Sequence, residues 1–216
     1  MPRIAICFSG FIRSYEKYFE SIKNLFNEDT DTYFYGYKHD DDTDEYVRSF
    51  IRDYNFKKYV IKNYSEEFLK EININPSILS VQNKNTLSMF YNIYKCNELI
   101  DENYDLIIRA RTDIIIKDKL NLNDINEAIN NKAIIIPSEW CYKSVNPHAV
   151  TDTFAVGHPE PMNIYSNLIK IVNNSTNLHP ESLLGTHLHN NNVNVILKDN
   201  WIYDLDNARF RKTKKE

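Results

Sequence analysis

The stretch YDLIIRARTDIIIK, residues 104–117, places charged side chains inside an otherwise apolar segment. The runs on either side are rich in isoleucine, which is typical of a strand covered on both faces. Side chains alternate along a strand, so Arg109, Arg111 and Asp113 are expected on one side of it. Charges beside a core raise the free energy of the fold unless they pair with one another or meet a ligand. Two interpretations are therefore open: a structural cluster of ion pairs, or a site for an anionic ligand.

Around this segment, predicted strands alternate with predicted helices. Strands are expected at residues 3–9, 31–37, 57–62, 104–117, 132–137, 151–157 and 193–198. Helices are expected at residues 13–26, 84–102, 122–129, 159–173 and 180–190, with one more ending near Tyr54 and one starting at Ser65. This alternation predicts an α/β fold, a three-layer α/β/α sandwich with a mostly parallel central sheet.

The chain shows no linker and no internal repeat, so a single domain over residues 1–216 is expected. It divides into a first half at residues 1–117, a second half at 118–205 and a basic tail at 206–216.

The composition excludes several classes of protein. The chain has 216 residues with 42% hydrophobic and 26% charged residues, which is ordinary for a water-soluble domain. A net charge of -4 argues against broad nucleic-acid binding. The three cysteines have neither zinc-site spacing nor an even disulfide set, so reduced thiols and a cytoplasmic location are expected. No signal peptide and no transmembrane segment is predicted.

The residue bias points to the genome and to the surface. Glycine is scarce, with 4 residues, tyrosine is common, with 15, and the chain is rich in residues with AT-rich codons. We interpret this as an AT-rich genome, such as that of a large DNA virus or a low-GC bacterium; a viral protein would lie in the host cytoplasm. Tyrosine on the surface would also favour a homo-oligomer.

The segment SGFIRSYE, residues 9–16, follows the first predicted strand. Ser9 and Gly10 form a small corner that allows backbone to approach a ligand closely. Arg13 is expected to open the next helix, where it could clamp a phosphate. Ligands of parallel sheets bind beyond the carboxyl ends of the strands, which places these residues near Asp113 if the two strands are neighbours. The alternative is a plain turn with a surface arginine.

Two kinds of acidic position are candidates for a divalent cation. Asp113 ends a buried strand, where hard carboxylate oxygens could hold Mn²⁺ or Mg²⁺. Arg109 and Arg111 would then balance a diphosphate or hold the aspartate in place. Asp42 and Asp44 lie in an acidic loop, where helix capping and solvation explain them better than a metal does.

The order of the segments SGFIRSY, SMFYNIYKCNELI, YDLIIRARTDI, DTFAVG and PESLLGTHL resembles GT-A type glycosyltransferases. The likeness is greatest to small viral and bacterial members with an R-x-R-x-D strand, and it spans roughly Arg3 to Trp201. It implies a nucleotide-sugar donor on the first half, with a UDP-sugar favoured, and a glycan or protein acceptor on the second. It also implies an acidic motif that binds the diphosphate through Mn²⁺ or Mg²⁺. Here the first acid of the usual D-x-D is replaced, leaving Arg111-Thr112-Asp113, and this puts strong metal binding in doubt.

The resemblance also suggests roles for residues of the second half. Asp152 could accept a hydrogen bond from a sugar or acceptor hydroxyl, or it could cap a loop. Glu181, at the start of a helix, either complements the helix dipole or acts as the general base on the acceptor hydroxyl. His187 is either structural or completes a metal site with Asp113.

Two other functions stay open on the sequence alone. A nucleotidyltransferase would use a similar sheet with carboxylates and Mg²⁺, but SGFIRSY lacks the glycine-rich, lysine-bearing loop that this chemistry normally needs. A non-catalytic sugar-binding or scaffold protein on a decayed transferase fold is the other alternative, because a fold does not fix a function.

Overall fold

The structure is a computed structural model that describes residues 2–74, 77, 79–139, 141, 146–172 and 178–205. Its main element is a seven-stranded sheet in the order β3-β2-β1-β4-β7-β6-β8. The strands are β1 (Ile4–Phe11), β2 (Thr30–Lys38), β3 (Lys58–Asn63), β4 (Leu106–Ala110), β6 (Ala133–Pro137), β7 (Phe154–Gly157) and β8 (Asn194–Lys198). Only β7 runs antiparallel to its neighbours in this sheet. The predicted α/β fold with a mostly parallel sheet is confirmed.

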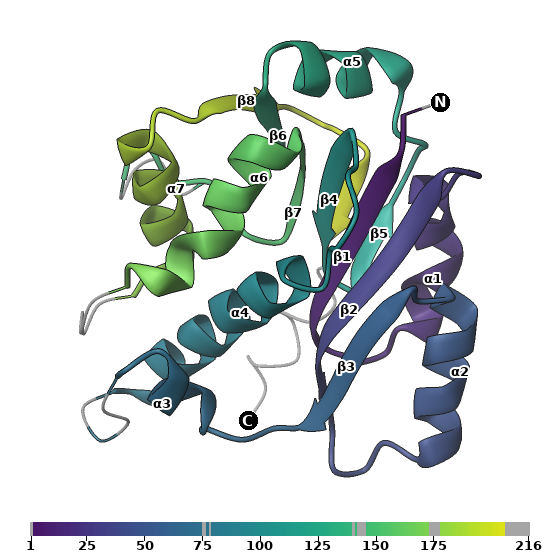
Figure 1. The fold of residues 1–216 in the computed structure, drawn as a ribbon, viewed down its shortest axis with the longest axis vertical. Coiled ribbons are helices and arrows are strands. Elements are labelled where there is room, and N and C mark those ends of the chain that lie inside the picture. Colours follow the sequence, from purple (N-terminus) through teal and green to yellow (C-terminus); the bar gives the residue numbers. More distant parts are fainter. Residues whose placement is uncertain are drawn as a thin grey trace, which may run out of the picture.

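Helices cover both faces of this sheet (Figure 1). They are α1 (Glu16–Ile22), α2 (Asp44–Tyr54), α3 (Phe68–Glu71), α4 (Val81–Asn97), α5 (Leu122–Asn130), α6 (Pro159–Ser166) and α7 (Pro180–Asn190). Two 3₁₀ turns, Lys23–Leu25 and Asn167–Lys170, extend α1 and α6. Helices α1 and α2 lie on one side of the sheet, and α4, α6 and α7 lie on the other. Among the described helices, none combines the length and the apolar character needed to cross a membrane.

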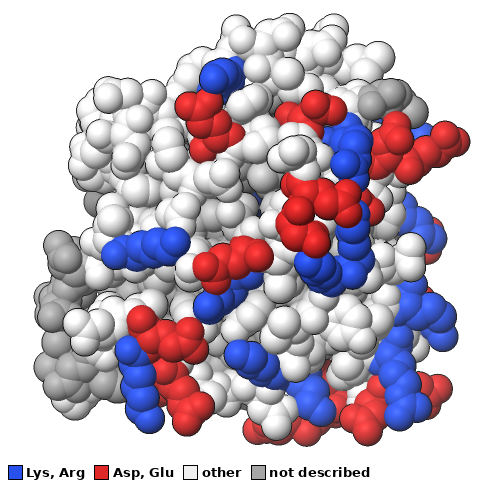
Figure 2. All heavy atoms as spheres, in the orientation of Figure 1, with Lys and Arg blue, Asp and Glu red and all other residues white. Residues whose placement is uncertain are grey.

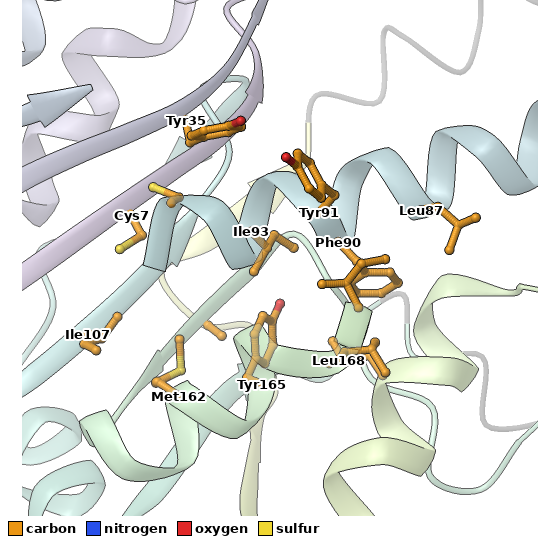
Figure 3. Close-up of a cluster of buried hydrophobic side chains, with 14 of the residues drawn as sticks. Cys7, Tyr35, Leu87, Phe90, Tyr91, Ile93, Ile107, Met162, Tyr165 and Leu168 are labelled. Carbon is orange, nitrogen blue, oxygen red and sulfur yellow. The ribbon is translucent and has the colours of Figure 1, made fainter. Parts of the chain in front are cut away.

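Alternating side chains of the strands fill two separate cores. On β1, Ile6 and Phe8 pack with the core of α1 and α2, whereas Ala5 and Cys7 pack with the core of α4 and α6. Figure 3 shows the second core, in which Tyr165 of α6 lies beside the strands and α4. This period-two division of apolar residues is what produces the three layers.

The prediction of one strand over residues 104–117 is wrong in its second part. Strand β4 ends at Ala110, and residues 111–113 form a turn. The next strand, β5 (Ile114–Ile116), pairs with β9 (Tyr203–Leu205) in a separate two-stranded sheet. The chain therefore leaves the central sheet where the charges begin, so only Arg109 lies on a strand of that sheet. The basic tail predicted at 206–216 lies outside the described residues.

Two further expectations from the sequence can be compared with this fold. Asp42 accepts a hydrogen bond from His39 N at 2.7 Å, Thr43 caps α2, and Asp44 lies in the first turn of that helix. Most tyrosines whose side chains the structure describes are core residues. The buried ones are Tyr15, Tyr18, Tyr33, Tyr35, Tyr37, Tyr54, Tyr91, Tyr104 and Tyr165. A homo-oligomer stays a prediction, but tyrosine on the surface no longer supports it.

A glycine pair fixes how closely β1 approaches β2 at the carboxyl end of β1. Gly10 and Gly36 are opposite each other in the ladder, and a Cβ at position 36 would lie 1.7 Å from the Gly10 carbonyl oxygen. We expect Gly36→Ala to lower the free energy of unfolding by more than about 3 kcal/mol, because backbone atoms must move to make room. Urea denaturation measures this change.

The matched control is Gly10→Ala. A Cβ there meets nothing within 4 Å, but the φ angle of +112° disfavours alanine. Its expected loss is the smaller one, about 1–3 kcal/mol. Equal stability of Gly36→Ala and the unsubstituted protein would contradict the assignment of this close contact.

Candidate anion-binding site

A cavity of about 320 Å³ lies at the carboxyl ends of β1 and β4, beside α4. This volume falls in the range of small-molecule sites. Its lining includes Ser9, Gly10, Arg13, Arg109, Arg111 and Asp113, so six candidate residues of the sequence meet in one place. They meet because β1 and β4 are paired neighbours. The sequence places Ser9, Gly10 and Arg13 near Asp113 only if these two strands are adjacent.

Direct contacts join the loop after β1 to the turn after β4. The Thr112 hydroxyl lies 3.1 Å from the Phe11 carbonyl oxygen and 3.0 Å from that of Ile12, and it donates to them. Arg13 Nη1 lies 3.1 Å from Asp113 Oδ2. Arg13 does not open a helix, as had been predicted: α1 starts at Glu16, and Arg13 sits before it with a φ angle of +50°. This left-handed conformation is uncommon for a residue other than glycine.

Asp113 is buried and held by two guanidinium groups. Arg111 Nε donates to Asp113 Oδ1 at 2.7 Å, and Arg111 Nη2 donates to Asp113 Oδ2 at 2.8 Å. Arg13 adds a third hydrogen bond, to Oδ2. Both carboxylate oxygens are thus occupied by arginine, while the side chains of Arg13 and Arg111 stay 41% and 24% exposed. The two arginines keep an accessible side toward the cavity.

Arg109 differs from the other two arginines because it is only 2% exposed and no ion pair to it is found among the described residues. Its Nη1 donates to the Thr153 carbonyl oxygen at 3.3 Å, and its Nε is buried without a hydrogen-bond partner in the described structure. Burial lowers the pKa of Arg109, as does the nearby Arg111, whereas the charge of Asp152 raises it. Arginine nevertheless stays protonated in proteins. The cavity wall thus carries a buried cation, and an anion or a polar ligand that reaches it would stabilise its charge.

Helix α4 contributes polar side chains that the sequence analysis did not identify. Asn85, Ser88 and Asn92 line the cavity from one side of the helix. Within the described part of the chain, the Oδ1 atom of Asn92 and the Oγ atom of Ser9, which also lines the cavity, are buried without a hydrogen-bond partner. Their spacing, at i, i+3 and i+7, places them on one side of a helix, and this was the signal in the sequence. The prediction rested instead on the apolar residues between them, which give the helix its apolar side. These oxygen atoms suit a ligand that carries hydroxyl groups.

Asp152 and Glu181 form a second group of candidates and are not among the described residues that line the cavity; the charge of Asp152 acts on both Glu181 and Arg109. Asp152 is buried just before β7, and the Tyr165 hydroxyl donates to its backbone carbonyl at 3.2 Å. Burial raises the pKa of Glu181, and the negative charge of Asp152 raises it further, while His179 acts in the opposite direction. His179 Nδ1 lies 3.3 Å from Glu181 Oε2. The structure thus brings the two predicted carboxylates together, and a carboxyl with a raised pKa is suited to accept a proton.

The tripeptide His-Pro-Glu occurs twice, and the two copies have different surroundings. Both start a helix, α6 at residues 158–160 and α7 at 179–181. Glu160 is 63% exposed, and a hydrogen bond and the charge of Lys132 lower its pKa. Glu181 is 17% exposed and its pKa is raised. Its position in the first turn complements the helix dipole, but that position is shared with Glu160 and does not explain the burial of Glu181.

The residues present do not fit the divalent cation that the sequence resemblance implies. His187 does not line the cavity: its Nε2 lies 2.8 Å from the Ile164 carbonyl oxygen and its Nδ1 lies 3.2 Å from Asn191 Nδ2. Within the described part of the chain, no three His, Cys, Asp or Glu side chains are grouped to hold a metal. Asp113, the one carboxylate among the described residues that line the cavity, has both oxygens on arginine.

The charge of the cavity is opposite in sign to that of the whole chain. Its described lining holds three arginines and one aspartate, a net of two positive charges, whereas the chain has a net charge of -4. On the face shown in Figure 2, positive and negative side chains are interspersed and form no broad basic patch. The positive charge is thus concentrated in a cavity, which suits a small anion better than a nucleic acid.

Comparisons with known proteins give little beyond this geometry. No protein-family model matches the chain, and no curated protein matches its sequence. Among solved structures, the apo form of mouse xyloside xylosyltransferase 1 is similar, with a TM-score of 0.49 and 12% identity over 92% of this chain and 85% of that one. A likeness at this level assigns no function to the chain.

Proposed function

We propose that the chain is a glycosyltransferase that moves a sugar from a nucleoside diphosphate sugar, with a UDP-sugar favoured, to a hydroxyl of a glycan or protein acceptor. The observation that carries this proposal is the buried Arg109, which has no ion pair with any described residue, in a cavity whose described lining has a net positive charge. A diphosphate linked to two groups carries one negative charge on each phosphate, which balances the two excess positive charges. The order of the sequence motifs supports the same class of donor.

Aromatic side chains at the cavity support a ligand with a flat ring. Phe11 and Tyr64 line it, with ring centroids 5.8 Å apart, and His39 stacks on Phe11 at 4.6 Å. Tyr64 is 38% exposed, so part of its ring is available for a contact. Bases stack on such rings whatever their identity, so this wall favours a nucleotide over inorganic phosphate without selecting the base.

The proposed chemistry uses the two groups of residues differently. The acceptor oxygen attacks the anomeric carbon, the bond from that carbon to the diphosphate oxygen breaks, and Glu181 takes the proton of the acceptor hydroxyl. The arginines stabilise the charge that develops on the departing diphosphate. Asp152 raises the pKa of Glu181 and so makes it a stronger base.

A second candidate is a protein that binds a nucleotide sugar without turnover. It is favoured by the arginine contacts of Asp113, because they leave the cavity without a carboxylate that is open to a ligand or a metal. Release of the nucleoside diphosphate separates the two candidates, since a binding protein would leave the donor intact.

The proposal is tested by thermal stability in a panel of UDP, GDP, CMP and dTDP sugars. A ligand at about 100 times its dissociation constant adds roughly 2.7 kcal/mol to the free energy of unfolding. For a chain of this length that corresponds to a rise in Tm of roughly 5–10 °C. We expect one donor class to give this rise, and Arg111→Ala to remove it.

Arg52→Ala is the control, since Arg52 lies on α2 with a side chain 75% exposed and does not line the cavity. It should keep the full rise in Tm. If no donor raises Tm, the proposal of a nucleotide-sugar site is overturned.

A further inference from the structure

The cavity holds more positive charge than a structural cluster needs. Asp113 neutralises one guanidinium, and its three hydrogen bonds from Arg13 and Arg111 occupy both of its oxygens. Arg109 and Arg111 lie close enough for the charge of Arg111 to lower the pKa of Arg109. Like charges in a low-dielectric site repel each other, so an anion bound between the arginines would stabilise the arrangement.

A divalent cation would worsen this imbalance. To reach Asp113 it would have to displace the bidentate contact of Arg111 and then sit among the three guanidinium groups of the cavity. Small divalent cations need several oxygen ligands, and the described residues offer no second carboxylate there. Arginine, in contrast, matches a phosphate with two parallel hydrogen bonds and stays charged at any physiological pH.

We propose that the cavity binds a diphosphate through Arg13, Arg109 and Arg111 without any divalent cation, and that Asp113 positions two of these arginines instead of ligating a metal. This inference deepens the proposed function and rests on it for the identity of the diphosphate as part of a donor. Arg109, which is only 2% exposed, supplies the buried charge at the cavity wall. Arg13 and Arg111, which are part-exposed, supply the outer contacts.

The test is calorimetric titration of the whole chain with inorganic pyrophosphate, first in EDTA and then with Mn²⁺. We expect binding in EDTA. Added Mn²⁺ should leave the affinity unchanged or weaken it, because Mn²⁺ pairs with pyrophosphate in solution and lowers its charge. Binding that occurs only with Mn²⁺ would overturn the inference while leaving the proposed function intact.

The other outcomes are also distinct. Binding in EDTA, combined with no nucleoside diphosphate release from any donor, would support the inference and reject the transferase. Failure to bind pyrophosphate under either condition would reject both, because the arginines would then be a structural cluster.

Asp113→Asn gives an independent comparison. A metal ligand replaced in this way should cost about a hundredfold or more in affinity for pyrophosphate with Mn²⁺ present. An aspartate that only positions arginines should instead cost the same factor in EDTA as with Mn²⁺ present, because the metal plays no part in that role. Arg111→Gln should weaken binding at least about tenfold, and the exposed Arg52→Gln should not change it. If Asp113→Asn does not fold, as judged by its melting curve, the titrations of the unsubstituted chain decide the question alone.

Discussion

Replacing Arg109 with methionine should weaken ligand binding strongly while destabilising the fold only modestly. Methionine fills a similar volume without the charge, and the guanidinium it removes is buried with one hydrogen bond, to the Thr153 carbonyl. We expect the affinity for pyrophosphate to fall by about a hundredfold or more, since loss of a buried charge contact removes at least about 2.7 kcal/mol. The free energy of unfolding should fall by about 1–3 kcal/mol, because the buried Thr153 carbonyl loses this donor. Calorimetry and urea denaturation measure the two quantities.

This prediction decides between the two interpretations of residues 104–117. If Arg109 belonged to a structural ion-pair cluster, its removal would leave an uncompensated buried carboxylate and lower stability by about 3–5 kcal/mol. Arg109→Lys is the companion variant, because it keeps the charge but lacks the planar guanidinium that makes two parallel hydrogen bonds. Its affinity for pyrophosphate should lie between that of Arg109→Met and that of the unsubstituted protein. A large loss of stability in Arg109→Met, with binding retained, would contradict the account.

The second large effect is expected at Glu181. Glu181→Gln should lower kcat by about 10²- to 10⁴-fold, because the amide cannot accept the proton of the acceptor hydroxyl. The dissociation constant of the donor should change less than about threefold, because Glu181 is assigned to the acceptor. The matched control is Glu160→Gln, which has the same position after a His-Pro pair but is exposed. Glu160→Gln should keep full activity. Equal losses of kcat in both variants would show that the substitutions act by disturbing the helix starts and not by removing a general base.

The pH dependence of the reaction follows from the surroundings of Glu181. Burial and the charge of Asp152 raise the pKa of Glu181. As the pH falls, Glu181 therefore takes up a proton, and stops acting as a base, at a higher pH than an ordinary glutamate does. We expect kcat/KM to rise with pH through this raised pKa. Asp152→Asn removes the neighbouring negative charge, which lowers the pKa of Glu181, so the acidic limb of the profile should move to lower pH. A limb that stays in place in Asp152→Asn would contradict the coupling of the two carboxylates.

One physical reason allowed both the fold and the meeting of the site residues to be predicted from the sequence. Alternating strand and helix patterns imply parallel strands, and parallel strands place their carboxyl ends together. This brought Ser9, Gly10 and Arg13 to Asp113 without any knowledge of the structure.

Other features depended on contacts distant in sequence. The turn at residues 111–113 exists because Thr112 bonds the loop after β1 and because β5 pairs with β9, which follows almost 90 residues later in the chain. The difference between Glu160 and Glu181 has no local signal, since both follow the same dipeptide; only the elements packed around each one separate them.

The measurement that tests the central claim most directly is nucleoside diphosphate release from the donor that gives the largest rise in Tm, with and without candidate acceptors. The account predicts release that acceptor hydroxyls accelerate, that persists in EDTA, and that falls at least about a hundredfold in Glu181→Gln but not in Glu160→Gln. A donor that binds tightly and stays intact under all these conditions would contradict the claim and leave a binding protein in its place.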